Sequence, residues 1–216
     1  MSGGSSERWL SRQRRDPYVK AARRDGRPSR AHYKLEQLDR RFELLEARQW
    51  VLELGAAPGG WTAWLAERLT RGRVIAVDPL PVAVRAENVE FVQGCLGDPV
   101  VDRRLAGLLA QGGQGGCGAV DLVLSDMAPN VSGIRAADQA GAMQLAELAG
   151  EAARKWLKPG GALVVKIFQG EGIDAWLRET RSRFGRVRVA KPPASRPGSR
   201  ENYAVARDYR GVSPAG

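Results

Sequence analysis

From residue 50 onward, short apolar runs alternate with amphipathic segments along the chain. Such runs predict buried strands, and apolar residues at helical spacing between them predict helices. Because the runs are too apolar to face water, the pattern favours an α/β fold in which helices cover both faces of a parallel sheet. The predicted strands cover residues 50–54, 73–77, 89–92, 119–124, 161–168, 186–190 and 202–206, and the predicted helices cover about 60–70, 99–110, 136–157 and 172–183.

The first fifty residues follow a different pattern. Leu35, Leu38, Phe42 and Leu45 recur at helical spacing and predict a helix over 31–47. The segment before this helix is polar and rich in arginine, which predicts a flexible basic arm that either contacts RNA or only aids solubility. The predicted boundaries are 1–28 for the arm, 29–210 for one folded domain and 211–216 for a disordered tail.

Composition adds a partner class to this picture. Lysine and arginine number 34 against 24 acidic residues, so the 216-residue chain carries a formal charge of +10. A field of that sign attracts polyanions, of which nucleic acid is the first candidate. A soluble protein that is basic for no specific reason stays open as the alternative, because charge names no reaction.

Cysteine and histidine are scarce. The chain has two cysteines, Cys95 and Cys117, and one histidine, His32, too few for a disulfide framework or a metal-ligand cluster. We therefore expect no metal. No apolar run is long enough to span a bilayer, and the polar start of the chain lacks the apolar core of a signal peptide. The expected location is the reducing cytoplasm, with no membrane partner.

A glycine-rich turn, GAAPGGW (55–61), follows the first predicted strand. Its spacing is neither the G-x-G-x-x-G of dinucleotide-binding folds nor a phosphate-binding loop ending in lysine. A turn that need not hold phosphate suits a nucleoside cofactor such as S-adenosylmethionine. Asp78, which ends the second strand, can accept hydrogen bonds from both ribose hydroxyls of such a cofactor, although Asp-Pro is also a common turn.

One lysine stands inside a strongly apolar strand. Lys166 occurs in the run VVKIF (164–168), and lysine is rarely buried without a partner. Asp126, which ends the preceding predicted strand, is the natural partner because parallel strands end at the same edge of a sheet. A lysine that only extends its ammonium from the strand end to water is the alternative.

Several sequence blocks resemble a known family, the FtsJ-type bacterial ribosomal RNA 2′-O-ribose methyltransferases. The resemblance covers roughly residues 28–208, with the blocks in order and at normal spacing. It implies a single-domain, Rossmann-like methyltransferase fold with a mostly parallel, seven-stranded sheet. The blocks are Ser29-Arg30 with Tyr33-Lys34-Leu35, LGAAPGGW (54–61), SDMAPNVSG (125–133), LKPGGALVVKIFQGEG (157–172) and SRENY (199–203).

The resemblance also implies site residues. Taken alone, Lys34 would be an ordinary exposed helix lysine and Glu201 an ordinary surface acid. The chain departs from the family after the third strand, where Cys95 stands in place of an aspartate expected near the adenine amino group. Either backbone groups or Asp98 take over this contact, or adenine is held less tightly. The implied catalytic residues are Lys34, Asp126, Lys166 and Glu201, and the implied cofactor-binding residues are Gly55, Gly59, Gly60, Trp61, Asp78, Cys95 and Asp126.

The implied reaction moves a methyl group from S-adenosylmethionine to a ribose 2′-hydroxyl. We expect Lys166 to act as general base, oriented by Asp126, while Lys34 positions the hydroxyl or the adjacent phosphate. Repulsion among the two lysines and the sulfonium favours a neutral amine, and the nearby carboxylates favour the ammonium. RNA would approach across the strand ends, drawn by basic residues that include Arg30, Arg181, Arg183, Arg186, Arg188, Lys191, Arg196 and Arg200.

The expected partner is ribosomal RNA, at a uridine of 23S rRNA within the large subunit, and the expected state is a monomer. These assignments would place the protein in rRNA processing and ribosome biogenesis. Methylation of tRNA or of an mRNA cap is the first alternative, because the four catalytic residues recognise the ribose and not its context. A nicotinamide-dependent oxidoreductase and a non-catalytic RNA-binding module are two further alternatives.

Overall fold

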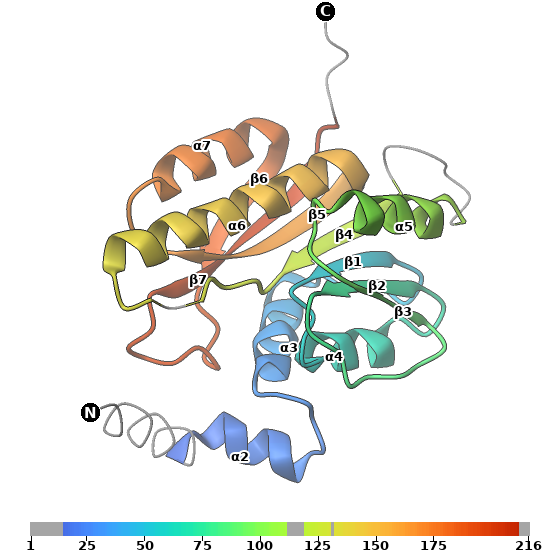
Figure 1. The fold of residues 1–216 in the computed structure, drawn as a ribbon, viewed down its shortest axis with the longest axis horizontal. Helices are drawn as coiled ribbons and strands as arrows, with labels where there is room; N and C mark the ends of the chain where they lie inside the picture. Colours follow the sequence, from blue (N-terminus) through green and yellow to red (C-terminus); the bar gives the residue numbers. More distant parts are fainter. Residues whose placement is uncertain (1–14, 112–118, 131, 212–216) are drawn as a thin grey trace, which may run out of the picture.

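A seven-stranded sheet forms the centre of the molecule, as the computed structural model shows for residues 15–111, 119–130 and 132–211 (Figure 1). The strand order is β3-β2-β1-β4-β5-β7-β6. The first five strands in this order, from β3 through β2, β1 and β4 to β5, pair in parallel, whereas β7 is antiparallel to both β5 and β6. The prediction of a mostly parallel sheet is therefore confirmed. The strands are β1 (Trp50–Leu54), β2 (Arg73–Asp78), β3 (Val89–Gln93), β4 (Val120–Ser125), β5 (Leu157–Phe168), β6 (Phe184–Ala190) and β7 (Glu201–Tyr209).

Helices cover both faces of the sheet, as predicted (Figure 1). Alternation along each strand explains why: in β1, Val51 belongs to the core under α3 and α4, whereas Leu52 and Leu54 belong to the core under α5, α6 and α7. None of the helices in the described part of the chain is both long and apolar enough to cross a membrane. The covering helices are α3 (Ala31–Phe42) and α4 (Gly60–Arg68) on one face, and α5 (Pro99–Ala110), α6 (Arg135–Trp156) and α7 (Ile173–Arg183) on the other.

Helix α2 (Pro17–Arg24) lies within residues 1–28, the segment predicted as a flexible basic arm, and the sequence analysis did not predict it. Asp16 caps the helix by accepting hydrogen bonds from the backbone N–H groups of Tyr18 and Val19, and Pro17 occupies a position where no amide proton is needed. Residues 1–14 of the predicted arm and 212–216 of the predicted tail lie outside the described residues.

Helix α3 is shorter than predicted and ends at Phe42 instead of residue 47. Glu43 adopts a left-handed conformation with φ of 49°, which terminates the helix. The buried carboxylate of Asp39 then accepts the backbone N–H groups of Leu44 and Leu45, at 3.1 and 3.0 Å. The apolar spacing continues past Phe42 because Leu44 and Leu45 pack into the core from a loop.

Candidate active site

A cavity of about 590 Å³ opens at the carboxyl ends of β1 to β4, where the strand order reverses between β1 and β4. Ligands of open α/β sheets bind at this point, and the volume lies in the usual range for a small-molecule site. Four of the predicted cofactor-binding residues line it: Gly55, Asp78, Cys95 and Asp126.

Gly55 and Asp78 shape the floor of this cavity. Gly55 has a φ of 76°, and a Cβ there would come within 2.8 Å of Met127, which also lines the cavity. Any side chain would therefore narrow the space. The carboxylate of half-buried Asp78 accepts the backbone N–H groups of Ala57 and Leu80 at 3.0 and 2.8 Å. Each oxygen keeps a further lone pair, which suits the two hydroxyls of a ribose.

Gly59, Gly60 and Trp61 do not belong to the described lining of the cavity. Gly60 lets the start of α3 approach α4, because a Cβ there would collide with the Ser29 hydroxyl. Trp61 is buried in the core, and its indole N–H donates to the carbonyl of Ala31 at 2.8 Å. Gly60 and Trp61 thus serve the packing of α3 against α4, and Gly59, with φ of 110°, starts α4, while their contact with the cofactor stays a prediction.

Cys95 lines the cavity with an exposed thiol, so the departure from the family falls within the site itself. Asp98 does not replace the missing carboxylate. It is the N-cap of α5, its carboxylate accepts the backbone N–H of Val100 at 2.7 Å, and it is not among the described lining residues. Of the alternatives for the adenine contact, backbone groups and weaker binding are the two that this placement favours.

Lys166 and Asp126 form an ion pair, as predicted, in which the lysine is buried and the aspartate half-buried. Lys166 is 8% exposed, and its Nζ lies 2.8 Å from Asp126 Oδ1 and donates to the Asp126 carbonyl at 2.7 Å. The alternative interpretation, in which the lysine only extends its ammonium to water, is therefore wrong. In the parallel register of β4 and β5, Ser125 is paired with Val165. The next residues along the two strands, Asp126 and Lys166, therefore lie beside each other.

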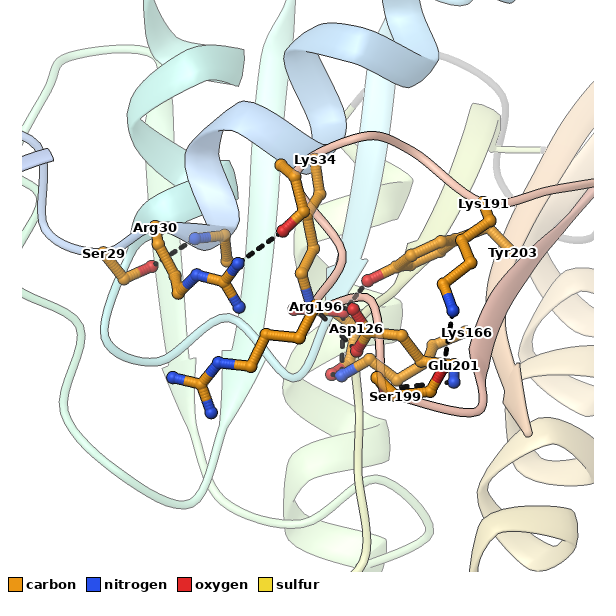
Figure 2. Close-up of polar contacts among 12 residues, drawn as sticks. Ser29, Arg30, Lys34, Asp126, Lys166, Lys191, Arg196, Ser199, Glu201 and Tyr203 are labelled. Atoms are coloured by element: carbon orange, nitrogen blue, oxygen red, sulfur yellow. Dashed lines mark hydrogen bonds and ion pairs between the residues drawn. The ribbon is translucent and has the colours of Figure 1, made fainter. Parts of the chain in front are cut away.

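Lys34 and Glu201 form a second ion pair beside the first (Figure 2). Lys34 Nζ lies 2.8 Å from Glu201 Oε1 and 3.0 Å from Oε2, and the two residues are 6% and 8% exposed. Lys34 comes from the start of α3, where it shares the buried face with Leu35 and Leu38. Neither residue is the ordinary surface group that its local sequence suggests.

Tyr203 joins the two ion pairs and is the functional candidate that sequence reasoning missed. It is fully buried, and its hydroxyl donates to Asp126 Oδ1 at 2.6 Å. Its ring lies 5.8 Å from Lys34 Nζ and packs against Trp61. The available signal was its position two residues after Glu201, which places both side chains on one face of β7.

The pairing of β5 with β7 explains how three of these groups meet. Lys166 is directly opposite Tyr203 in the antiparallel register, and Phe168 is opposite Glu201. Opposed residues on neighbouring strands project to the same face. Strand β7 therefore carries Tyr203 and Glu201 beside Lys166, and α3 adds Lys34 from above that face (Figure 2).

Charge pairing controls the protonation of the buried carboxylate. Burial alone would raise the pKa of Asp126, but the ammonium groups of Lys166 and Lys34, with hydrogen bonds from Lys166 and Tyr203, outweigh it and lower that pKa. Burial and the neighbouring charges of Asp126 and Glu201 raise the pKa of Tyr203 well above its ordinary value. The site thus holds an ionised aspartate against a neutral phenol at neutral pH.

Glu53 is a further buried acid, and the sequence analysis did not consider it. It lies on β1 with 1% exposure, and Thr62 donates a hydrogen bond to Oε2 at 2.8 Å, while Oε1 has no partner among the described residues. Burial raises the pKa of Glu53 to about 8. The carboxyl is therefore largely protonated near neutral pH.

This shift predicts a pH effect on stability. A raised pKa means that the folded state binds the proton more tightly, so the free energy of unfolding falls as pH rises from about 4.5 to about 8. Glu53→Gln, which stays neutral, is expected to match the wild type near pH 5 and to exceed its stability near pH 8.5 by a few kcal/mol. Urea unfolding at both pH values measures this, and an equal effect of the substitution at both would contradict it.

Comparison with known proteins identifies the family. The sequence model described as FtsJ-like methyltransferase matches residues 27–209, most of the chain. The chain belongs to the FtsJ-like methyltransferase family. It is therefore an S-adenosylmethionine-dependent methyltransferase.

Individual relatives cover nearly the whole chain. A ribosomal RNA large subunit methyltransferase E from Stutzerimonas stutzeri is 46% identical over 208 residues, which cover 96% of this chain and 98% of the relative. The protein of the same name from Coxiella burnetii is 43% identical over 210 residues, covering 96% and 97%. Both share the length of this FtsJ-like chain.

Solved structures agree in fold. A Plasmodium falciparum structure described as that of a ribosomal RNA methyltransferase superposes with a TM-score of 0.74 at 26% identity, covering 86% of this chain and 100% of that one. The fibrillarin of Methanococcus jannaschii superposes with a TM-score of 0.52 at 16% identity, covering 77% and 69%, and shows the fold alone. The Rossmann-like architecture predicted for this FtsJ-like chain is thus confirmed.

Proposed function

We propose that the protein transfers the methyl group of S-adenosylmethionine to a ribose 2′-hydroxyl of large-subunit ribosomal RNA, at a uridine of the 23S molecule. The observation that carries this proposal is the pair of buried lysine–carboxylate contacts at the edge of the cofactor cavity. Acceptance of a proton from a weakly acidic alcohol needs such groups. The names of the curated relatives favour ribosomal RNA over tRNA or an mRNA cap.

The cofactor would be held by the cavity-lining residues Gly55, Asp78, Cys95 and Asp126. When bound, S-adenosylmethionine supplies an electrophilic methyl group on a sulfonium cation. Gly55 would leave room for it, and the free lone pairs of Asp78 would accept hydrogen bonds from its ribose hydroxyls. Asp126 both lines this cavity and pairs with Lys166, so it connects the cofactor site to the base.

Lys166 is the general base of the proposal. In its neutral form, the Lys166 amine would accept the proton of the ribose hydroxyl as the hydroxyl oxygen takes the methyl group. Asp126 and Tyr203 fix the position of this amine, since their contacts restrict its rotation.

Lys34 keeps the substrate in place in this account. Its ammonium is held by Glu201 and remains a cation that can bind the 2′-hydroxyl or the adjacent phosphate. Beyond it, Arg30 and Arg196 share the carboxylate of Asp16 at 3.1 and 3.3 Å, and both lie beside the site (Figure 2). These guanidinium groups would bind backbone phosphates, which makes RNA affinity depend steeply on salt.

The thiol at position 95 gives a specific prediction for cofactor binding. Cys95→Asp restores a strong acceptor near the proposed adenine position, and a hydrogen bond to a charged acceptor contributes about 1.5–3 kcal/mol. We expect the Kd for S-adenosylmethionine to fall about tenfold, with Cys95→Asn giving a smaller gain. Isothermal titration calorimetry measures both variants, and an unchanged or weaker Kd for Cys95→Asp would show that position 95 does not contact adenine.

The substrate is tested by comparing methyl incorporation into isolated large ribosomal subunits, naked 23S rRNA and tRNA, with mapping of the modified nucleotide. The proposal predicts preferential 2′-O-methylation of a uridine in large-subunit rRNA. It further places the enzyme in the cytoplasm as a monomer. Preferential methylation of tRNA, or a methyl group on a base, would contradict it. Sedimentation of the active species checks the monomer.

A further inference from the structure

A second groove lies between α6 and α7, away from the cofactor cavity. It has a volume of about 490 Å³ and is lined by apolar residues that include Trp176 and Phe184. Among the described residues, no lining residue is shared with the cofactor cavity. None of the catalytic residues borders it, so methyl transfer gives no reason for its presence.

The floor of the groove contains a hydrogen-bond donor that is open to the groove. Trp176 is only 7% exposed, yet its indole nitrogen is not one of the fully enclosed polar atoms without a partner among residues 15–111, 119–130 and 132–211. Tryptophan N–H groups usually have an acceptor, and here water in the groove can serve as one. A ligand that enters the groove with a carbonyl oxygen would take the place of that water.

Gly150 keeps this donor uncovered. It lies within the 22-residue helix α6, where glycine costs about 1 kcal/mol relative to alanine. A Cβ at position 150 would meet the Trp176 indole nitrogen at 3.8 Å, an ordinary contact distance. Packing therefore does not require a glycine at this position. Its effect is to leave the indole nitrogen open to the groove.

The rim of the groove is acidic on a strongly basic protein. Three exposed carboxylates, Glu147, Glu151 and Glu179, face two arginines. Arg154 pairs with Glu151 and Glu179 at 3.4 and 3.6 Å, and Arg183 pairs with Glu179 at 3.2 Å. Glu147 has no ion pair in the described part of the chain. Of the three rim carboxylates, Glu147 is therefore the one that stays open to a cationic side chain.

We propose that this groove binds a lysine- or arginine-containing peptide segment of another protein. A main-chain carbonyl of the peptide accepts the hydrogen bond from Trp176, and a basic side chain pairs with Glu147. An apolar side chain of the peptide fills the space over Phe184. The acidic rim disfavours RNA, so this surface and the proposed RNA surface at Arg30 and Arg196 recognise partners of opposite charge.

The test uses the full chain labelled with ¹⁵N and the capped heptapeptide Gly-Arg-Leu-Lys-Arg-Leu-Gly. Comparison with Trp176→Phe assigns the indole N–H signal of Trp176. We expect the peptide to shift that signal and to saturate with a Kd of about 10–100 μM, as for a small contact. The same peptide with glutamate at its three basic positions is expected to leave the signal unchanged.

Two matched variants separate specific binding from general charge attraction. Glu147→Lys is expected to weaken binding about tenfold, whereas Glu87→Lys, an equal charge change at an exposed residue outside the groove, leaves the Kd unchanged. Trp176→Phe removes the donor and keeps an aromatic ring, and weakens binding about fivefold in a calorimetric titration. The proposal would be overturned by any of three results. The substitutions at positions 147 and 87 could change the Kd equally, the Trp176 signal could stay unshifted at about 1 mM peptide, or single-stranded RNA could shift that signal in place of the peptide.

Discussion

Lys166→Ala is expected to lower the single-turnover rate of methyl transfer by about 10³-fold. The substitution removes the proposed proton acceptor, and a positioned base contributes about 10²–10⁴-fold to a rate. It also leaves the Asp126 carboxylate buried with Tyr203 as its remaining partner on β7, which disturbs the cofactor side of the site. Rapid-quench measurement with excess enzyme on isolated large subunits separates this rate from product release.

Lys158→Ala is the matched control. Lys158 lies on the same strand, β5, and its Nζ pairs with Asp121 at 3.1 Å, but this pair is far along the strand from the cavity. We expect a rate within about twofold of the wild type, since one partly exposed ion pair contributes little. A Lys166→Ala rate within tenfold of the Lys158→Ala rate would remove Lys166 from the proton transfer.

Asp126→Asn is expected to reduce both stability and rate. Removal of one partner from a buried ion pair leaves an uncompensated charge, here the Lys166 ammonium, at a cost of about 3 kcal/mol. The rate of methyl transfer should fall about 10²-fold or more, because the amine loses the carboxylate that positions it. Urea unfolding and single-turnover kinetics give the two quantities.

The stability effect of Asp126→Asn has a predicted pH dependence. Because the folded-state pKa of Asp126 is lowered, its contribution is complete above the ordinary aspartate value and is lost as pH falls through the folded-state pKa. The variant and the wild type should therefore differ at pH 7 and converge in acid. Asp121→Asn, at the half-exposed pair with Lys158, is the control and should cost less than about 1 kcal/mol. Equal stability of Asp126→Asn and the wild type at pH 7 would contradict the account.

The central strands could be predicted because their apolar runs are buried on both faces, and most helices because apolar residues recur on the one face that packs on the sheet. Helix α5, predicted over 99–110, occurs as Pro99–Ala110, since Asp98 and Pro99 mark its start in the sequence itself. Helix α2 was missed although Asp16 and Pro17 mark its start in the same way. Ala22 is its one buried residue, so the segment has no apolar periodicity from which a helix could be predicted.

The candidate site was predictable in part for the same physical reason. Lys166 and Asp126 could be paired from the sequence, because Lys166 stands near the end of one apolar strand and Asp126 follows the end of its neighbour. The prediction of Lys34 and Glu201 as site residues depended on the family resemblance. Each is the ion-pair partner of the other across 167 residues of sequence, and local sequence does not reveal such a contact. The roles of Tyr203 and Glu53 follow from the register of β7 and the packing of α4, which apolar periodicity does not reveal.

The pH dependence of single-turnover methyl transfer by Lys166→Arg, measured beside the wild type, tests the central claim most directly. Arginine preserves the positive charge and a contact with Asp126, but it cannot lose a proton in the accessible range. The account predicts that the wild-type rate rises with pH to a plateau, and that Lys166→Arg stays at least about 10²-fold slower throughout. A Lys166→Arg rate close to the wild type, with the same pH profile, would contradict the assignment of Lys166 as the base.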